Sequence, residues 1–426
     1  MIFSSMMPPT KPYEHSRENY SQIWKASIWG SFLFLPAMIN FLFRDTSFAV
    51  GTALSAIFVF AIYILVNRRD SSYNALKFMI ASFVVAATVI VHLLISNIIL
   101  HDPSFNFMRA IYIIPVFLSI LSILPFLSKI LIENNGPSLK TAQFICLIYM
   151  LISIMSLMKI QPATESYGEK PIFPYTEPSF FAFSIGALLI YTVTLSPRFI
   201  KVTILLISFT VGYLLSNLTI IMACILVSLI SLPTYLLIVM ASTFFLVQTN
   251  FDFTYYYDRL NFDWERSFNI STLVYVQGWQ LIEESLIKTW GWGVGFQQLG
   301  VVSNNVLASF RIVSLLGRDA NILDGGFILS KLLSEFGIFG ILLSAVYSWI
   351  AIRGFFTLRR VATKKDYRSG SEVFAYSCIV GYSIELFVRG SSYFTGTFVL
   401  LLASLLYLWR QRVVREFSHN PVYQNT

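Results

Sequence analysis

The sequence is poor in charged residues. Only 12% of its 426 residues are Asp, Glu, Lys or Arg, whereas 56% are hydrophobic. Soluble domains carry about 25% charged and about 45–50% apolar residues. A chain with half the usual charge has too few polar side chains to cover a surface that faces water. The composition therefore excludes an ordinary soluble protein and predicts one that is embedded in a membrane.

Metal ligands and disulfide partners are also scarce. The four histidines are scattered along the chain without the spacing of metal ligands: His15, His92, His101 and His419. Each of the three cysteines falls inside an apolar segment: Cys146, Cys224 and Cys378. We therefore expect cysteines that pack between helices, no disulfide framework, no metal centre and no cofactor.

Long apolar segments recur along the whole chain, and about twelve of them approach the 20 or so residues that a helix needs to cross a bilayer. They lie near 23–43, 47–66, 75–100, 108–132, 140–158, 178–195, 199–215, 217–231, 233–248, 326–352, 373–388 and 395–410. We predict an all-α, polytopic membrane protein with about twelve transmembrane helices in a single transmembrane domain, 1–426. The part from 199 to 248 fits either three short helices or two long tilted ones.

The distribution of positive charge predicts the orientation of these helices. The formal net charge is +8, and about 19 of the 30 Lys and Arg residues fall in alternate connections, most of them short. Cytoplasmic loops of membrane proteins carry such an excess. We therefore interpret the charge as a sign of topology, with both termini cytoplasmic, and expect no nucleic-acid partner.

Two connections on the opposite, outer side are long. The shorter, 159–177, contains three prolines, which forbid a regular helix. The longer, 249–325, has about 77 residues, and a loop of this length is usually functional. Within it, apolar residues at helical spacing predict an amphipathic helix over 271–290. Because Trp279 and Trp290 belong to this helix, we expect it to lie on the membrane surface rather than cross the membrane.

The large outer loop also concentrates cations, with carboxylates between them. These cations are Arg259, Arg266, Lys288, Arg311 and Arg318. The planar guanidinium group suits bidentate contacts with phosphate or carboxylate. A cluster of this kind beside a membrane points to a lipid-linked diphosphate as the ligand. The alternative is a solvated loop with ordinary ion pairs.

Four ionisable residues fall inside or at the ends of predicted spans. Lys331 and Glu335 are four positions apart in one span, and Glu385 and Arg389 are four apart in another. Charges in lipid are costly and usually face a cavity or one another. The spacing also permits a structural salt bridge within each helix. Arg389 is the stronger candidate for binding, because a glycine and Tyr393 follow it in a short turn that is expected to open toward the outer loop.

Two further features of the outer loop have competing interpretations. The run 291–300, GWGVGFQQLG, begins with the glycine that we expect to end the amphipathic helix. No strand precedes the run and no Lys-Ser/Thr follows it, so it does not match a nucleotide-binding loop. It is either a turn whose amides approach an anion or a sugar, or a purely structural turn. Asp324 is placed either to act as a general base for a sugar hydroxyl or to cap the next helix.

Three segments carry a resemblance to a known family. They are NISTLVYVQGWQLIEESLIKTWGWGVGFQQLG (269–300), ILSKLLSEFGIFGILL (328–343) and ELFVRGSSYFTG (385–396). In a polytopic chain with a long outer loop, they resemble the Wzy-type O-antigen polymerases of Gram-negative bacteria, which are related in architecture to the O-antigen ligases. The resemblance implies a metal-independent glycosyltransferase of GT-C-like architecture in the inner membrane. Such an enzyme joins undecaprenyl-diphosphate-linked repeat units on the periplasmic face, with inversion at the anomeric carbon.

The resemblance also guides the choice of site residues, since loop arginines of the family bind the diphosphate. The catalytic candidates are Asp324, Arg266 and Arg389. The candidates for substrate binding are Arg259, Arg311, Arg318, Tyr393, Lys331 and Glu335. Many relatives carry a His-Asn pair about ten residues before a Glu-x-Gly motif, whereas this sequence has Asp-Gly-Gly at 324–326. Asp324 is therefore a substitute for the base by position and not by match.

The implied partners are an undecaprenyl-diphosphate-linked oligosaccharide, membrane lipid and a polysaccharide chain-length regulator. Two other functions stay open. An O-antigen ligase would use the same donor with lipid A-core as the acceptor, and the missing His-Asn pair counts against it. A repeat-unit flippase or other transporter fits about twelve helices, but the long amphipathic loop and the lack of a visible internal repeat count against it.

Overall fold

The computed structural model describes most of the chain. The described residues are 28–43, 48–66, 72–134, 137–160, 172–175, 177–233, 236, 254–263, 265–302, 306–364, 366, 368–390 and 392–418. Nearly all of the predicted span near 233–248, most of the loop 159–177 and the ends of the chain lie outside these residues.

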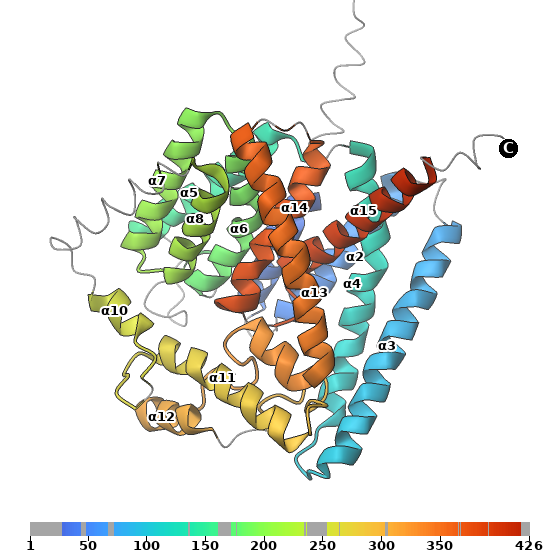
Figure 1. Cartoon of the computed structure of the whole chain (residues 1–426), viewed down its shortest axis with the longest axis vertical. Helices are drawn as coiled ribbons and strands as arrows, with labels where there is room; N and C mark the ends of the chain where they lie inside the picture. The colour runs from blue at the N-terminus through green and yellow to red at the C-terminus, as the bar shows by residue number, and fades with distance from the viewer. Residues whose placement is uncertain are drawn as a thin grey trace, which may run out of the picture.

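Within the described residues, every named element is an α-helix and no β-strand is present, so the predicted all-α fold is confirmed. The helices are Ile28–Leu42, α2 (Phe48–Val66), α3 (Ser72–Leu100), α4 (Phe107–Asn134), α5 (Leu139–Leu157), α6 (Pro178–Leu195), α7 (Arg198–Leu214), α8 (Leu218–Ser231), α10 (Thr254–Leu260), α11 (Ile270–Lys288), α12 (Leu307–Leu316), α13 (Ile328–Lys364), α14 (Gly370–Phe387) and α15 (Gly396–Ser418). Figure 1 shows a bundle of long helices, with α10, α11 and α12 of the outer loop gathered at one end of it.

The bundle is that of a membrane protein. Five described helices are long and apolar enough to cross a membrane: Ile80–Leu100 in α3, Phe107–Ile132 in α4, α5, α6 and Ile328–Thr363 in α13. The count of about twelve crossings stays a prediction. In the ambiguous region from 199, α7 and α8 are separate helices, because the side chain of Asn217 caps the start of α8. This separation favours short helices over long tilted ones.

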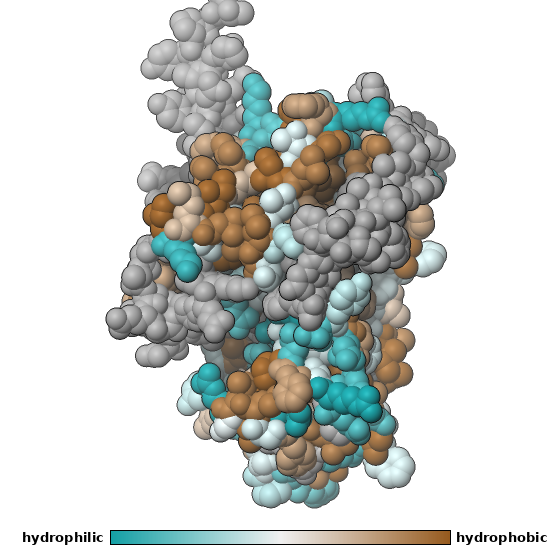
Figure 2. All heavy atoms as spheres, turned by 90° about the vertical axis from the view of Figure 1, so that its left-hand side faces the viewer, coloured by the Kyte–Doolittle hydropathy of each residue, from teal (hydrophilic) through white to brown (hydrophobic). Residues whose placement is uncertain are grey.

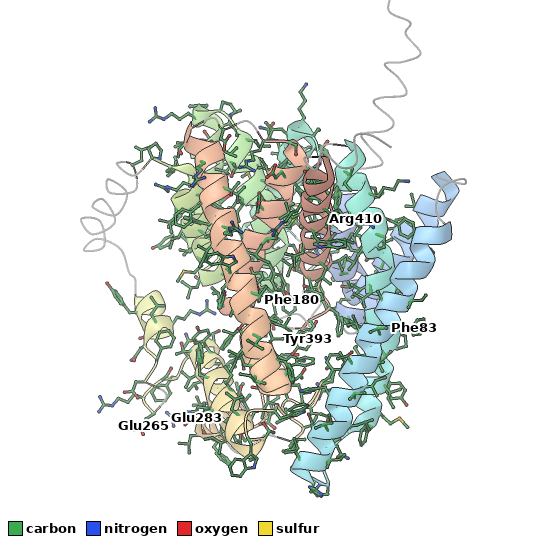
Figure 3. All side chains as sticks on the ribbon, turned by 45° about the vertical axis from the view of Figure 1, so that its right-hand side comes forward. Phe83, Phe180, Glu265, Glu283, Tyr393 and Arg410 are labelled. Atoms are coloured by element: carbon green, nitrogen blue, oxygen red, sulfur yellow. The ribbon has the colours of Figure 1, made fainter. Side chains whose placement is uncertain are left out.

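Helices α6 and α14 form the centre of the bundle. Every residue of α6 from 181 to 194 is buried. The two helices approach closely, since a Cβ at Gly381 would lie 2.7 Å from the Cα of Ala187. Small residues at such contacts are typical of membrane helices. By contrast, α3 lies at the edge and keeps apolar side chains such as Phe83 exposed, as a helix that faces lipid does (Figures 1 and 3).

The predicted helix of the outer loop is present as α11. The face that it packs against α12 and α13 contains polar and small residues, among them Gln277 and Ser285, which are fully buried. Trp290 is exposed, and Trp279 stays partly exposed although its ring lies 5.4 Å from that of Phe327 between centroids. This buried face, which also includes Leu273, Val274, Leu281 and Ile282, holds the helix to the protein and leaves both indole rings accessible to a membrane surface.

Close backbone contacts explain why small and polar residues form this packed face. A Cβ at Gly278 would lie 2.3 Å from the carbonyl oxygen of Gly325, so only glycine fits there. The hydroxyl of Ser330, on α13, donates to the carbonyl of Gly278 at 2.8 Å. The amide of Gln277 donates to the hydroxyl of Ser309, on α12, at 2.7 Å. These bonds fix α11 between the other two helices.

The glycine run after α11 closes on a break in α13. The helix is interrupted at Gly337, whose φ of 54° and ψ of −126° are not helical. Such a break deprives nearby backbone carbonyls of their helical partners. The amides of Val294 and Gly295 donate to the carbonyls of Ser334 and Glu335 at 2.9 and 3.0 Å. Because these two amides are used within the protein, this part of the run is a structural turn rather than an anion site.

The break makes a prediction for Gly293. Its φ is +97°, and an added Cβ would lie 2.5 Å from the carbonyl oxygen of Glu335 and 2.6 Å from the backbone nitrogen of Gly337. We expect Gly293→Ala to lower the free energy of unfolding by about 2–3 kcal/mol, measured by thermal unfolding in detergent. Gly317→Ala is the control, because its φ is +67° but its Cβ would meet nothing within 4 Å. Its cost should be about 1 kcal/mol, and equal losses at both positions would contradict this steric explanation.

Candidate functional site

A cavity of about 690 Å³ lies between the bundle and the outer loop. Its wall is formed by the start of α6, the turn between α7 and α8, helix α10, the start of α11 and the turn after α14. On this side of the molecule, most of the described residues in the upper half are apolar, whereas polar and apolar residues are mixed in the lower half (Figure 2). The volume lies in the range of about 300–1,000 Å³ that is common for ligand sites.

The first cation in the wall is Arg259, which comes from α10. Its Nη2 donates to the hydroxyl of Ser271 at 2.7 Å, and its Nη1 donates to the carbonyl of Ser216 at 3.4 Å. The hydroxyl of Thr272 donates to the backbone carbonyl of Arg259 at 2.9 Å. The start of α11 therefore positions both the side chain and the backbone of this arginine at the cavity.

The second cation in the wall is Arg389, which follows α14. Its Nη2 lies 3.4 Å from Oε2 of Glu177, and the two side chains are 21% and 42% exposed. The next residue, Gly390, donates its amide to the carbonyl of Gly326 at 3.1 Å. A Cβ at Gly390 would lie 2.5 Å from the side chain of Ile328, so the turn fits tightly against α13.

The structural salt bridge that the four-residue spacing permits between Glu385 and Arg389 is not formed. Arg389 contacts Glu177, and the carboxylate of buried Glu385 accepts a hydrogen bond from the hydroxyl of Thr397. Because Arg389 does not pair with Glu385, its side chain is available to line the cavity.

Glu177 is a wall residue that no sequence pattern singles out. It is the last residue of the loop 159–177 and directly precedes α6, which begins with Pro178. Its Oε2 also accepts a hydrogen bond from the hydroxyl of Ser179 at 3.0 Å. The only signal in the sequence is its position, an acid between an outer loop and a predicted span. No spacing rule connects it with Arg389, which is 212 residues away.

A second group of predicted site residues, around Lys331, is not among the described residues that line the cavity. This side chain is only 2% exposed, and its Nζ donates to the carbonyl of Leu323 at 3.0 Å. It lies 3.5 Å from Oδ1 of Asp324 and 5.5 Å from the ring centre of Tyr393. Among the described residues, its ion-pair partner is Asp324 and not Glu335, so the pair that the spacing permits within α13 is not formed.

Asp324 does not cap α13, because the helix begins only at Ile328. It is also not among the described residues that line the cavity, although Asn321 of the same turn is. Tyr393 and Glu335 are both buried. Tyr393 stacks with Phe296, and burial raises the pKa of its hydroxyl well above the usual range, which keeps it neutral. Tyr393 lies inside the molecule in Figure 3.

The other three candidate arginines lie on the outer loop away from the cavity wall. Arg266 is 87% exposed, and its Nε lies 3.7 Å from a carboxylate oxygen of Asp263. The guanidinium group of Arg311 lies 5.1 Å from the ring centre of Phe268. Arg318 is exposed beyond the end of α12. The structure thus brings Arg259 and Arg389 to one cavity and leaves Arg266, Arg311 and Arg318 outside it.

The burial of Lys331 makes a second prediction. Lys331→Met keeps the length of the side chain but leaves the carbonyl of Leu323 and the carboxylate of Asp324 without their donor. We expect the free energy of unfolding to fall by about 1–3 kcal/mol, measured by thermal unfolding in detergent. Lys140→Met is the control, because Lys140 is an exposed side chain near the start of α5. Its effect should be within about 0.5 kcal/mol, and a similar loss in both variants would show that Lys331 has no special structural role.

No family model matches the chain, and no similar curated protein or solved structure was found. The resemblance to O-antigen polymerases therefore depends on the three sequence segments alone. Independently of it, the chain is an α-helical membrane protein with a cavity at one end of the bundle, lined by two arginines from distant parts of the sequence.

Proposed function

We propose that the protein polymerises oligosaccharide repeat units carried on undecaprenyl diphosphate, by transferring the lipid-linked chain to a hydroxyl of the incoming unit. The cavity carries this proposal. It has two arginines in its wall, and it lies where the apolar bundle meets the polar outer loop. A lipid-linked sugar diphosphate has the same division into an apolar tail, an anionic centre and a polar head.

The two arginines have the chemistry that a diphosphate requires. Each guanidinium group presents several N–H donors in a plane and stays charged at any physiological pH. Arg259 and Arg389 come from different segments, so a diphosphate bound between them would connect the outer loop to the bundle. Interactions between charges are stronger beside apolar protein than in open water.

The same groups would assist the reaction. The oxygen of the acceptor hydroxyl forms a bond with the anomeric carbon, while the bond from that carbon to the diphosphate oxygen breaks. The electron pair leaves with the diphosphate, whose negative charge increases at this step. Donors already aimed at the place where charge develops lower the barrier, and this is the role that we assign to Arg259 and Arg389.

The apolar part of the wall would receive the start of the prenyl chain. Leu215, Leu218 and Met222, at and after the turn between α7 and α8, line the cavity. On the same two helices, Leu214 and Ile225 remain exposed. A chain leaving the cavity along α7 and α8 would thus meet apolar side chains before it enters the lipid.

The resemblance supplies the cellular setting of the proposal. The protein would lie in the inner membrane with both termini in the cytoplasm, and the cavity would open on the periplasmic side. A chain-length regulator would be its protein partner.

A lipopolysaccharide gel of a strain that lacks the gene, with and without a complementing plasmid, tests the function. Collapse of the ladder to core plus one repeat unit is the expected result, because ligation and flipping would still operate.

Two other gel patterns would contradict polymerisation. Bare core without any repeat unit would indicate a ligase or a flippase. An unchanged ladder would exclude all three functions.

Variants of the two wall arginines make a third prediction. Arg259→Ala and Arg389→Ala should each lower the turnover of lipid-linked repeat units by about 10²–10³-fold, with unchanged abundance in the membrane. The lysine variants should recover little of this, because an ammonium group lacks the planar fork. The assay uses purified protein in nanodiscs and follows product length on a gel. Arg360→Ala is the control and should stay fully active, because Arg360 is near the C-terminal end of α13 and is not among the described residues that line the cavity.

Arg266→Ala distinguishes the role that the resemblance implies from the one that the geometry supports. The resemblance gives Arg266 a catalytic role, whereas its exposed position outside the cavity wall predicts near-normal turnover. Loss of activity in Arg266→Ala with retained activity in Arg259→Ala would contradict the assignment of the cavity.

A further inference from the structure

We infer that Glu177 is the general base that takes the proton from the acceptor hydroxyl. This inference rests on the proposed function and adds a catalytic residue to the same cavity. In the step, the acceptor oxygen bonds to the anomeric carbon, its proton passes to a carboxylate oxygen of Glu177, and the diphosphate leaves with the electron pair of the broken bond.

The composition of the cavity wall singles out Glu177. Among the described residues that line the cavity, Glu177 is the only one with a carboxylate, and none is a histidine, a lysine or a cysteine. The other ionisable side chains in the wall are the two arginines and Tyr275, and none of these is a base near neutral pH. Of the described wall residues, Glu177 is therefore the one suited to accept a proton from a bound hydroxyl.

The three carboxylates that the sequence singled out near this end of the bundle are paired or buried. Asp324 lies outside the described wall and pairs with the buried Lys331. Glu335 and Glu385 are at most 1% exposed and do not line the cavity. Glu177 is 42% exposed, so a sugar hydroxyl can reach it without any rearrangement of the bundle.

The side chain of Glu177 is held on one oxygen and free on the other. Oε2 accepts hydrogen bonds from Ser179 and Arg389, whereas Oε1 has no hydrogen bond with the described residues. The backbone beneath it is fixed, since the side-chain amide of Asn217 donates to the carbonyl of Pro178 at 2.7 Å. A carboxylate with one oxygen anchored and one open is oriented to receive a proton.

The contact with Arg389 links the base to the donor. The distance of 3.4 Å and the partial exposure of both side chains make this a loose ion pair, which contributes little to stability. A diphosphate offers Arg389 more negative charge than a single carboxylate does, so donor binding would draw the guanidinium group away from Glu177.

The experiment compares Glu177→Gln with the wild-type protein in nanodiscs, with the undecaprenyl-diphosphate-linked repeat unit extracted from the gene-deficient strain as the probe. Glutamine keeps the shape and an acceptor for Arg389 but cannot take a proton. We expect kcat to fall by about 10²–10⁴-fold, while KM changes less than about twofold. The fall in rate at acidic pH, which reports protonation of the base, should vanish from the residual activity. Glu283→Gln, on exposed Glu283 of α11 (Figure 3), is the matched control and should behave like wild type.

Each other outcome has one meaning. If Glu177→Gln raises KM while kcat and the fall in rate at acidic pH persist, Glu177 only positions Arg389 and the inference is wrong. Retained activity in Glu177→Gln would also overturn it. If the glutamine variant does not fold, Glu177→Asp replaces it. The aspartate variant should have a reduced kcat and should keep the fall in rate at acidic pH. Loss of this pH dependence would count against a base at this position. A wild-type protein that makes no ladder would overturn the proposed function itself, whereas with an active wild type the result bears on Glu177 alone.

Discussion

One constraint determines the arrangement of the end of the bundle where α10, α11 and α12 gather: buried backbone polar groups need hydrogen-bond partners. The break of α13 at Gly337 deprives carbonyls of their helical donors, and the glycine turn after α11 supplies amides to them. This bond pattern ties the end of α11 to α13, while the contact of Ser330 with Gly278 ties its middle. The start of α11 then holds Arg259 through Ser271. The helix whose end is bound to the break in α13 therefore forms, with its start, part of the cavity wall.

At this end of the bundle, Lys331 and Arg389 differ in how firmly other groups of the protein bind their charged side chains. Lys331 is buried, bonded to a backbone carbonyl and paired with Asp324, so its charge contributes to the folded structure. Among the described residues, the guanidinium group of Arg389 has one loose ion pair, with Glu177, and its turn is pressed against α13 by Gly390. A fixed backbone with a loosely held cationic side chain is a typical binding arrangement. The cavity therefore offers a cation to a ligand, whereas the charge of Lys331 is used within the protein.

The sequence predicted much of the fold because the relevant signals are local. Apolar runs located the long helices that the structure describes, and the glycine run located the end of α11, whereas the short helices α10 and α12 were not predicted. The same signals did not predict which helix faces pack most closely together. In α11, hydrophobic residues such as Trp279 suggested one important face, but Gly278 and Gln277 make the closest contacts with α12 and α13. Close helix packing selects small size and a matching hydrogen bond, and hydrophobic periodicity reports neither.

By itself, the sequence determined the class of the protein, an all-α membrane protein, and the residue types available to a site, because composition and periodicity are properties of short segments. Only the tertiary structure decided which of the charged residues meet. Glu177, Arg259 and Arg389 come from three segments separated by up to 212 residues, and each finds the cavity through contacts that its own segment does not encode. Lys331 and Glu385 likewise have partners other than those at four-residue spacing, since the neighbouring helices and turns offered nearer groups.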